Sequence, residues 1–155
     1  TVAIKRRIIH NLRPSLLDTL GVGPALNALC EDYSRRTGRP CAVDVAEFLG
    51  ELEPQWPITI YRVAQECLTN ITKYADAHHV EVSLLREELG VRLKIIDDGV
   101  GIADDSFDRP LSHGLRGMRE RVRQFGGLFA IRRNPDAPGT IAEAFLPFPG
   151  LVLAP

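Results

Sequence analysis

The stretch that decides the fold runs from residue 59 to residue 76 and reads TIYRVAQECLTNITKYAD. Its apolar side chains recur at intervals of three and four residues, which predicts an amphipathic helix. At about 100° per residue, Glu66, Asn70 and Lys73 fall within roughly 60° of one another, beside the apolar face. The apolar face consists of Ile60, Val63, Ala64, Cys67, Leu68 and Ile71.

The three polar residues beside this face suit the binding of a nucleoside triphosphate. A carboxylate can orient a nucleophile or a water molecule, an amide oxygen can bind Mg²⁺, and an ammonium group can meet phosphate. A solvated polar edge explains the same residues if the helix is taken alone. The rest of the sequence has to decide between these two interpretations.

A strand followed by a glycine turn forms the second motif. Residues 91–96 alternate and then become wholly apolar, which is typical of a strand that enters a core. They lead into the run DDGVG at residues 97–101, where glycines two residues apart let the backbone approach a ligand closely. Asp97 could accept the exocyclic amine of adenine, and an ordinary Asp-Gly turn is the alternative. A dinucleotide-binding loop is disfavoured because Asp104 stands where that motif has its third glycine.

Two further glycine motifs follow. The run SHGLRGM at residues 112–118 precedes an amphipathic helix that we expect from Met118 to Phe125. Glycine amides in a loop before a helix offer an anion site, and a flexible loop with a helix cap is the alternative. His113 suits a solvent-facing position as well as a phosphate contact. Farther along, the run PGT at residues 138–140 precedes an alternating strand.

The remaining pattern predicts a mixed sheet with helices layered on one face. We expect a helix from Pro24, well placed as a first helical residue, to about Arg36. Residues 103–113 are rich in Asp and lack periodicity, which predicts a mobile lid. Strands are expected at residues 41–45, 80–85, 91–96, 128–132 and 140–146.

Composition narrows the function without deciding it. A chain of 155 residues suits one domain, and a net charge of −1 argues against a dedicated nucleic-acid binder. No apolar run is long enough to cross a membrane and no secretion signal stands at the start, so a cytoplasmic setting is expected. The adjacent His78 and His79 are too few for a metal site. Neither a disulfide framework nor a zinc site is indicated by Cys30, Cys41 and Cys67.

Together, the motifs resemble the ATP-binding catalytic domain of bacterial sensor histidine kinases, specifically the nitrate-sensor-like subfamily. This domain belongs with the gyrase, chaperone, histidine-kinase and mismatch-repair ATPases. Residues 61–77 match the subfamily's asparagine box, residues 97–101 its first glycine box and residues 114–118 its second. Residues 139–140 match its closing glycine–threonine pair, and residues 118–121 match its Met-Arg-Glu-Arg signature.

The resemblance implies a fold and a set of site residues. The fold would be a two-layer α/β sandwich of the Bergerat type, with a mixed sheet and helices on one face. Glu66 would be the catalytic carboxylate, and Asn70 would hold Mg²⁺. The residues implied to bind ATP are Asn70, Lys73, Asp97, Gly99, Gly101, His113, Gly114, Leu115, Gly117, Met118 and Thr140.

The implied activity is protein histidine kinase, with ATP and Mg²⁺ as cofactors. The γ-phosphoryl group would pass to a histidine on dimerisation helices of a longer, homodimeric protein, and then to an aspartate of a response regulator. This could be the cytoplasmic part of a membrane-anchored sensor. One alternative is a non-catalytic nucleotide-sensing or docking module of the same fold. An anti-sigma serine kinase is a second alternative, disfavoured by Leu12-Arg13-Pro14 and by the signature at residues 118–121.

The resemblance also divides the chain. Residues 1–14 would be the end of a dimerisation helix, residues 15–23 a linker, residues 24–148 the ATP-binding catalytic domain and residues 149–155 a tail. His10 is not expected to be the phosphoryl acceptor, because a proline four residues later ends that helix. The chain by itself is therefore not expected to phosphorylate itself.

Overall fold

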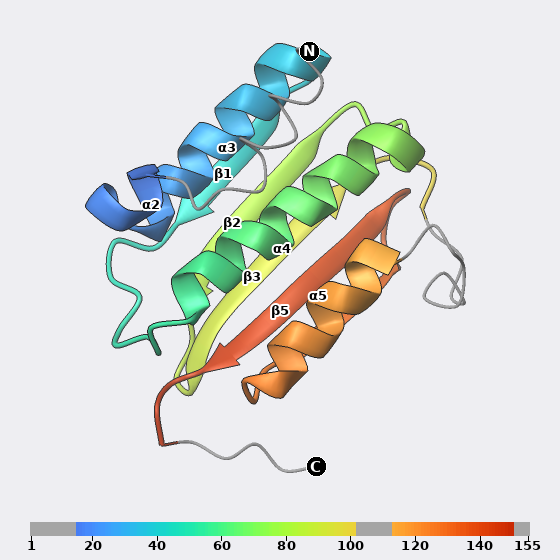
Figure 1. Cartoon of the computed structure of the whole chain (residues 1–155). Helices are drawn as coiled ribbons and strands as arrows, with labels where there is room; N and C mark the ends of the chain where they lie inside the picture. Colours follow the sequence, from blue (N-terminus) through green and yellow to red (C-terminus); the bar gives the residue numbers. More distant parts are fainter. Residues whose placement is uncertain (1–14, 102–112, 151–155) are drawn as a thin grey trace.

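A five-stranded sheet is the base of the fold (Figure 1). The computed structural model describes residues 15–101 and 113–150. The strands lie in the order β1-β2-β3-β5-β4. β1 runs parallel to β2, and every other neighbouring pair is antiparallel, so the sheet is mixed as predicted. The strands span Cys41–Val45 (β1), Val80–Arg86 (β2), Gly90–Asp97 (β3), Leu128–Arg133 (β4) and Thr140–Pro147 (β5).

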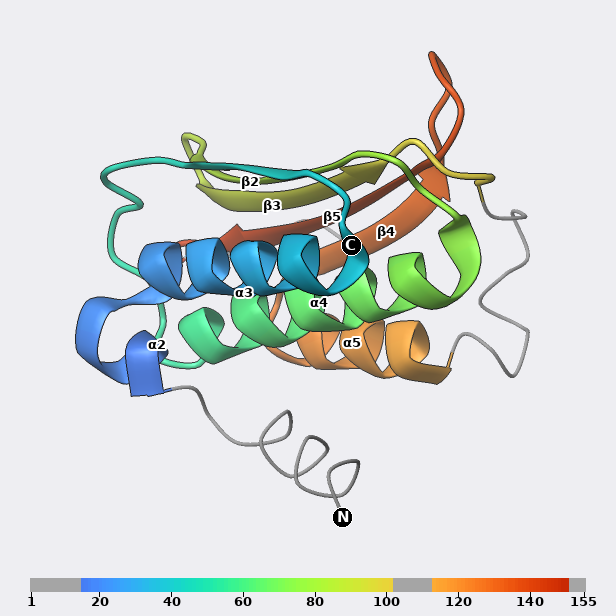
Figure 2. The ribbon, with the colours of Figure 1, turned by 90° about the horizontal axis from the view of Figure 1, so that it is seen from above.

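Helices cover one face of this sheet (Figure 2). α4 (Trp56–Asn70) lies between α3 (Val22–Thr37) and α5 (His113–Gln124). A shorter helix, α2 (Ser15–Leu20), packs against α3. The arrangement confirms the predicted two-layer α/β sandwich. Within the described ranges, none of the helices combines the length and the apolar character needed to span a bilayer.

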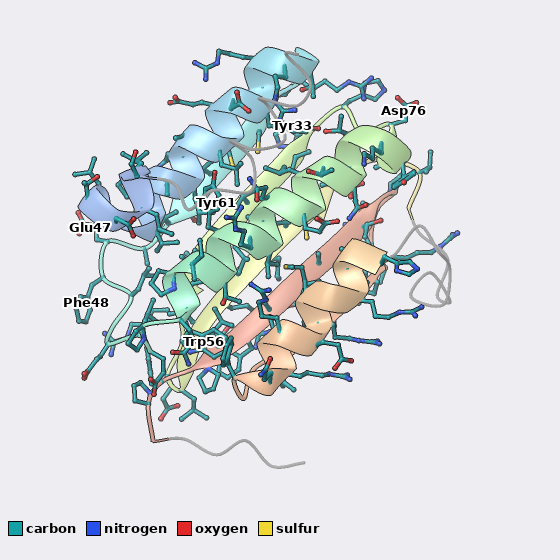
Figure 3. The ribbon with its side chains drawn as sticks, viewed as in Figure 1. Tyr33, Glu47, Phe48, Trp56, Tyr61 and Asp76 are labelled. Atoms are coloured by element: carbon teal, nitrogen blue, oxygen red, sulfur yellow. The ribbon has the colours of Figure 1, made fainter. Side chains whose placement is uncertain are left out.

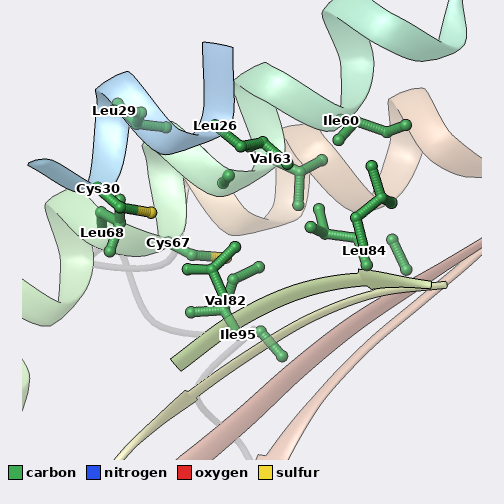
Figure 4. Close-up of a cluster of buried hydrophobic side chains, with 14 of the residues drawn as sticks. Leu26, Leu29, Cys30, Ile60, Val63, Cys67, Leu68, Val82, Leu84 and Ile95 are labelled. Carbon is green, nitrogen blue, oxygen red and sulfur yellow. The ribbon is translucent and has the colours of Figure 1, made fainter. Parts of the chain in front are cut away.

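The apolar face of α4 forms the middle of the hydrophobic core (Figure 4). Ile60, Val63 and Leu68 are fully or almost fully buried on this helix. The strands below contribute a matching layer, because every second residue of β3 points toward the helices. The face predicted from residues 59–76 is therefore the one that packs on the sheet. The strand residues it meets include Val82, Leu84, Leu93 and Ile95.

The ends of α4 differ from the prediction. The helix begins at Trp56 rather than at residue 59, with Pro57 in its first turn, where a missing N–H costs nothing. At the other end, α-helical geometry stops at Asn70, and residues 71–75 form a π-helical turn, η1 (Ile71–Ala75). Asp76 ends this turn in a left-handed conformation with φ of 49°. The expected single helix thus changes its period before it ends.

The start of α5 corrects a second prediction. The helix begins at His113 and not at Met118, so residues 113–118 of the glycine motif are helical and do not form a loop before the helix. Leu115 and Val122, seven residues apart, are both buried on the inner side of α5. Their packing outweighs the helix cost of the two glycines.

The expected linker also contains regular structure. Residues 15–20 form α2, and Leu17 is buried against the core. Three other expectations lie outside the described residues: the end of a dimerisation helix at residues 1–14, with His10, residues 103–112 of the lid, and residues 151–155 of the tail.

Charged side chains cover the face of the sheet that the helices leave open. The Arg92 Nε atom lies 2.5 Å from Glu87, and its Nη1 atom lies 3.2 Å from Glu143. Arg132 also donates to Glu143. Burial of Glu143 opposes its ionisation, but the hydrogen bond and charge of Arg132, together with Lys94, outweigh burial and lower the pKa of Glu143. Because these charged side chains lie on the face without helices, that face of the sheet can be exposed to water.

The network predicts a pH-dependent contribution to stability. We expect Glu143→Gln to lower the free energy of unfolding at pH 7 by about 1 kcal/mol. Because the pKa of Glu143 is lowered on folding, its contribution is present above the unfolded-state pKa and disappears as the pH falls through the folded-state pKa. Urea titrations at about pH 7 and about pH 3 should therefore show a smaller difference from the parent at the lower pH.

The matched control is Glu88→Gln, at an exposed position in the β2–β3 turn. This variant should change stability by less than about 0.5 kcal/mol at both pH values. An equal loss at both pH values for Glu143→Gln would contradict the ion-pair explanation.

Candidate functional site

Asp97 is a buried carboxylate at the end of β3. The residue is 4% exposed, and its Oδ1 atom accepts a hydrogen bond from the Gly99 N–H at 2.8 Å. Thr140, which is 5% exposed, lies opposite Asp97 on β5 and donates its N–H to the carboxylate. Burial raises the pKa of Asp97, and the Gly99 hydrogen bond offsets part of that shift. A carboxylate and a hydroxyl side by side in an apolar core provide a site for a polar ligand.

Glycines bring three stretches of backbone together around this carboxylate. A Cβ at Gly99 would overlap the carbonyl oxygen of Ala75, and a Cβ at Gly139 would overlap the carbonyl oxygen of Asp97. Gly139 also has φ of 114°, which disfavours a side chain. Gly101, with φ of 77°, lies against Gly139. The first glycine box and the closing glycine thus form one tightly packed unit.

Glu66 and Asn70 lie one turn apart on α4, beside the start of α5. The Asn70 Nδ2 atom donates to the Glu66 carbonyl at 3.0 Å and to the Glu66 Oε1 atom at 3.4 Å. The Glu66 carboxylate touches the backbone of Gly114, where a Cβ would overlap Oε1. Because its amide nitrogen turns toward Glu66, Asn70 presents its carbonyl oxygen as the remaining ligand atom.

Lys73 does not follow the predicted spacing. Its predicted direction, close to those of Glu66 and Asn70, assumed α-helical geometry as far as Lys73, but the α-helix ends at Asn70. Lys73 lies in the π-helical turn η1, where each turn contains more residues, and its side chain is exposed. π-helical turns are frequent at functional sites.

The second glycine box occupies the first turns of α5. His113 is exposed at the start of the helix. Leu115 is buried, and Met118 packs against the hydrophobic core. The amide of Gly117 lies beyond the first turn, and the first-turn amides that α-helical geometry leaves open within the described part of α5 are those of residues 113–115. An anion could meet these amides at the positive end of the helix.

All these elements meet at one end of the molecule (Figure 1). Asp76 marks this end of α4 and Trp56 marks the opposite end (Figure 3). Sequence reasoning missed residues that build the wall of the site, notably Asp98 and Arg39, which bond to the segment between η1 and β2. The doubled carboxylate in DDGVG was the signal that could have identified Asp98.

Comparison with known proteins agrees with this geometry. Residues 57–150 match the family described as histidine kinase-, DNA gyrase B-, and HSP90-like ATPase. The sensor histidine kinase MctS of Rhizobium johnstonii is 36% identical over 144 residues, which are 92% of this chain and 31% of MctS. The nitrate/nitrite sensor protein NarX of Escherichia coli is 28% identical over 142 residues, 92% of this chain and 23% of NarX. The chain thus spans less than a third of either relative.

A solved structure shows the same fold. The histidine kinase AdeS of Acinetobacter baumannii superposes with a TM-score of 0.68 at 18% identity, covering 96% of this chain and 81% of that chain. The family resemblance that the four motifs indicated is confirmed.

The crowded surroundings of Gly99 and the open surroundings of Gly117 predict opposite effects of alanine substitution on the free energy of unfolding. Gly99→Ala should lower the free energy of unfolding by about 1–3 kcal/mol, because its methyl group would collide with the rigid backbone at Ala75. Gly117→Ala should raise it by about 0.5–1 kcal/mol, because alanine favours the helix and no described atom lies within 4 Å of the added methyl group. Equilibrium urea unfolding of both variants tests the pair, and equal signs would contradict it.

Proposed function

Because the chain belongs to the family of histidine kinase-, DNA gyrase B- and HSP90-like ATPases, we propose that it is the ATP-binding catalytic domain of a two-component sensor histidine kinase. The observation that carries this proposal is the buried Asp97 carboxylate beside Thr140. It lies at the end of the fold where Glu66 and Asn70 stand on the adjoining helix. The names of the similar proteins, sensor kinases and a nitrate/nitrite sensor, support this assignment.

Asp97 and Thr140 would recognise adenine. Oδ1 of Asp97 already accepts the Gly99 N–H, so the other carboxylate oxygen can accept the exocyclic amine of adenine. Guanine carries a carbonyl oxygen at that position, which would face an acceptor. The neighbouring Thr140 hydroxyl can bond a ring nitrogen or a bridging water. Gly99 and Gly101 would let the backbone approach the base.

Asn70 would hold Mg²⁺. An amide oxygen next to a carboxylate is a hard oxygen donor set, and Mg²⁺ takes one or two such protein ligands together with substrate phosphates. When bound, the ion would neutralise charge on the phosphate oxygens. Lys73 and the first-turn amides of α5, including that of Gly114, would meet the phosphates from the other side.

Glu66 would act as the base or polarising carboxylate next to the acceptor. The γ-phosphoryl group would go to a histidine on dimerisation helices of the longer protein and then to a response-regulator aspartate. Most of the catalysis would come from positioning and charge neutralisation. The full protein would be a homodimer with this domain in the cytoplasm. Since the acceptor helices would supply the histidine, this chain alone should not phosphorylate itself.

Nucleotide selectivity tests the role of Asp97. In calorimetry with Mg²⁺, ATP and ADP should bind at least about tenfold more tightly than GTP, because guanine would place its carbonyl oxygen against the second oxygen of the buried carboxylate, where adenine places a donor. Asp97→Asn should abolish measurable ATP binding. Its single oxygen would stay with Gly99, and its amide would then point donors at the adenine amine.

The matched control is Asp44→Asn, at an exposed position on β1, which should bind ATP like the parent. Equal affinities for ATP and GTP would contradict the assignment of Asp97.

Phosphoryl transfer tests the role of Glu66. In the full-length kinase, Glu66→Gln should keep ATP affinity while slowing autophosphorylation by about 100-fold or more, because the general base is lost. Labelling with radioactive ATP measures the rate, and Glu88→Gln serves as control. Full activity in Glu66→Gln would instead favour a different base, and no transfer in the parent would favour a non-catalytic nucleotide-sensing module.

A further inference from the structure

The segment between η1 and β2 forms the wall of the site next to Asp97. It comprises residues 76–79 and follows Ala75, the last residue of η1, whose carbonyl accepts the Val100 N–H at 2.8 Å. The same carbonyl lies against Gly99 so closely that no side chain fits there. The position of the π-helical turn, which carries Lys73, is therefore tied to the chain that follows Asp97.

The Asp98 carboxylate fastens the far end of this segment. Its Oδ1 atom accepts the N–H groups of His78 at 2.8 Å and of His79 at 2.9 Å. The Asp98 N–H in turn donates to the His79 carbonyl at 3.3 Å. The hydrogen bond from the His79 N–H, and after it that from the His78 N–H, hold the pKa of Asp98 below its ordinary range. The carboxylate is therefore ionised at neutral pH.

Arg39 fastens the middle of the segment from the opposite side. Its guanidinium donates to the carbonyl of Ala77 and lies 3.3 Å from the carboxylate of Asp76. Ala77 is buried, whereas Asp76 is in the left-handed conformation that ends η1. The segment is thus bonded from both sides, by Arg39 on one side and on the other by Asp98, the residue that follows the proposed adenine-binding carboxylate.

We propose that Asp98 is a positioning residue for nucleotide binding, which acts through the backbone of His78 and His79 and does not touch the nucleotide. Asp97, the last residue of β3, is buried, whereas Asp98, directly after the strand, is exposed. Asp97 would read the base, and Asp98 would fix the segment that directly follows the turn carrying Lys73. This inference rests on the proposed function, because it assumes that the site binds ATP.

Three variants separate positioning from general stability. Asp98→Ala removes the acceptor and should weaken Mg²⁺–ATP binding about tenfold, in line with the loss of two charge-assisted hydrogen bonds. Asp98→Asn keeps an oxygen for both amides and should bind within about twofold of the parent. Asp44→Ala, an exposed carboxylate on β1, is the control and should match the parent. If the alanine variant does not fold, Asp98→Glu, with its carboxylate displaced by one methylene, should show the same weakening.

Hydrogen exchange provides a second readout that requires no nucleotide. The amides of His78 and His79 should exchange faster in Asp98→Ala and at the parental rate in Asp98→Asn. A lower melting temperature with unchanged ATP affinity in Asp98→Ala would overturn the inference, as would equal weakening by alanine and asparagine. Failure of the parent to bind ATP would instead overturn the proposed function. Faster exchange at the two amides in Asp98→Ala would still show that Asp98 holds the backbone of His78 and His79.

Discussion

Burial of the apolar face of α4 against β2 and β3 sets the geometry of everything at the ligand end. A fully buried large aliphatic side chain contributes about 1.5–3 kcal/mol, so Ile60, Val63 and Leu68 together fix the rotation of the helix about its axis. That rotation in turn fixes the direction of Glu66 and Asn70, which stand beside the buried face. The proposed catalytic groups thus take their orientation from the core, and substitutions in the middle of α4 should affect both stability and ligand binding.

The site is assembled mostly from backbone. Around Asp97, contacts at Gly99 and Gly139 leave no room for a Cβ, and Asp98 bonds to two amides. Backbone packed in this way has few alternative arrangements, because movement of one segment would break contacts with the next. The arrangement gives rigidity to the end of the domain that holds Asp97.

Several parts of this design could be read from the sequence, and others could not. The hairpin of β2 and β3 and the buried face of α4 follow directly from the spacing of apolar residues, a local property. The start of α5 was wrong because Gly114 and Gly117 favour a loop when taken alone, whereas burial of Leu115 and Val122 decides for a helix. The π-helical turn that carries Lys73 was not predicted, because such a change of period has no signature in apolar spacing. The role of Asp98 depends on a contact between residues twenty positions apart, which one sequence does not reveal.

The glycines in the first turns of α5 have a consequence for the energetics of this helix. Each glycine in a helix gives up about 0.5–1 kcal/mol relative to alanine, because the unfolded chain keeps more freedom at that residue. Gly114 and Gly117 thus lower the helix preference of the first five residues of α5, and the buried Leu115 holds this end in place. Val122 anchors the C-terminal half. For a ligand that requires a rearranged amide at the N-terminal end, the glycines reduce the backbone cost of unwinding, and release of Leu115 from the core sets the remaining cost.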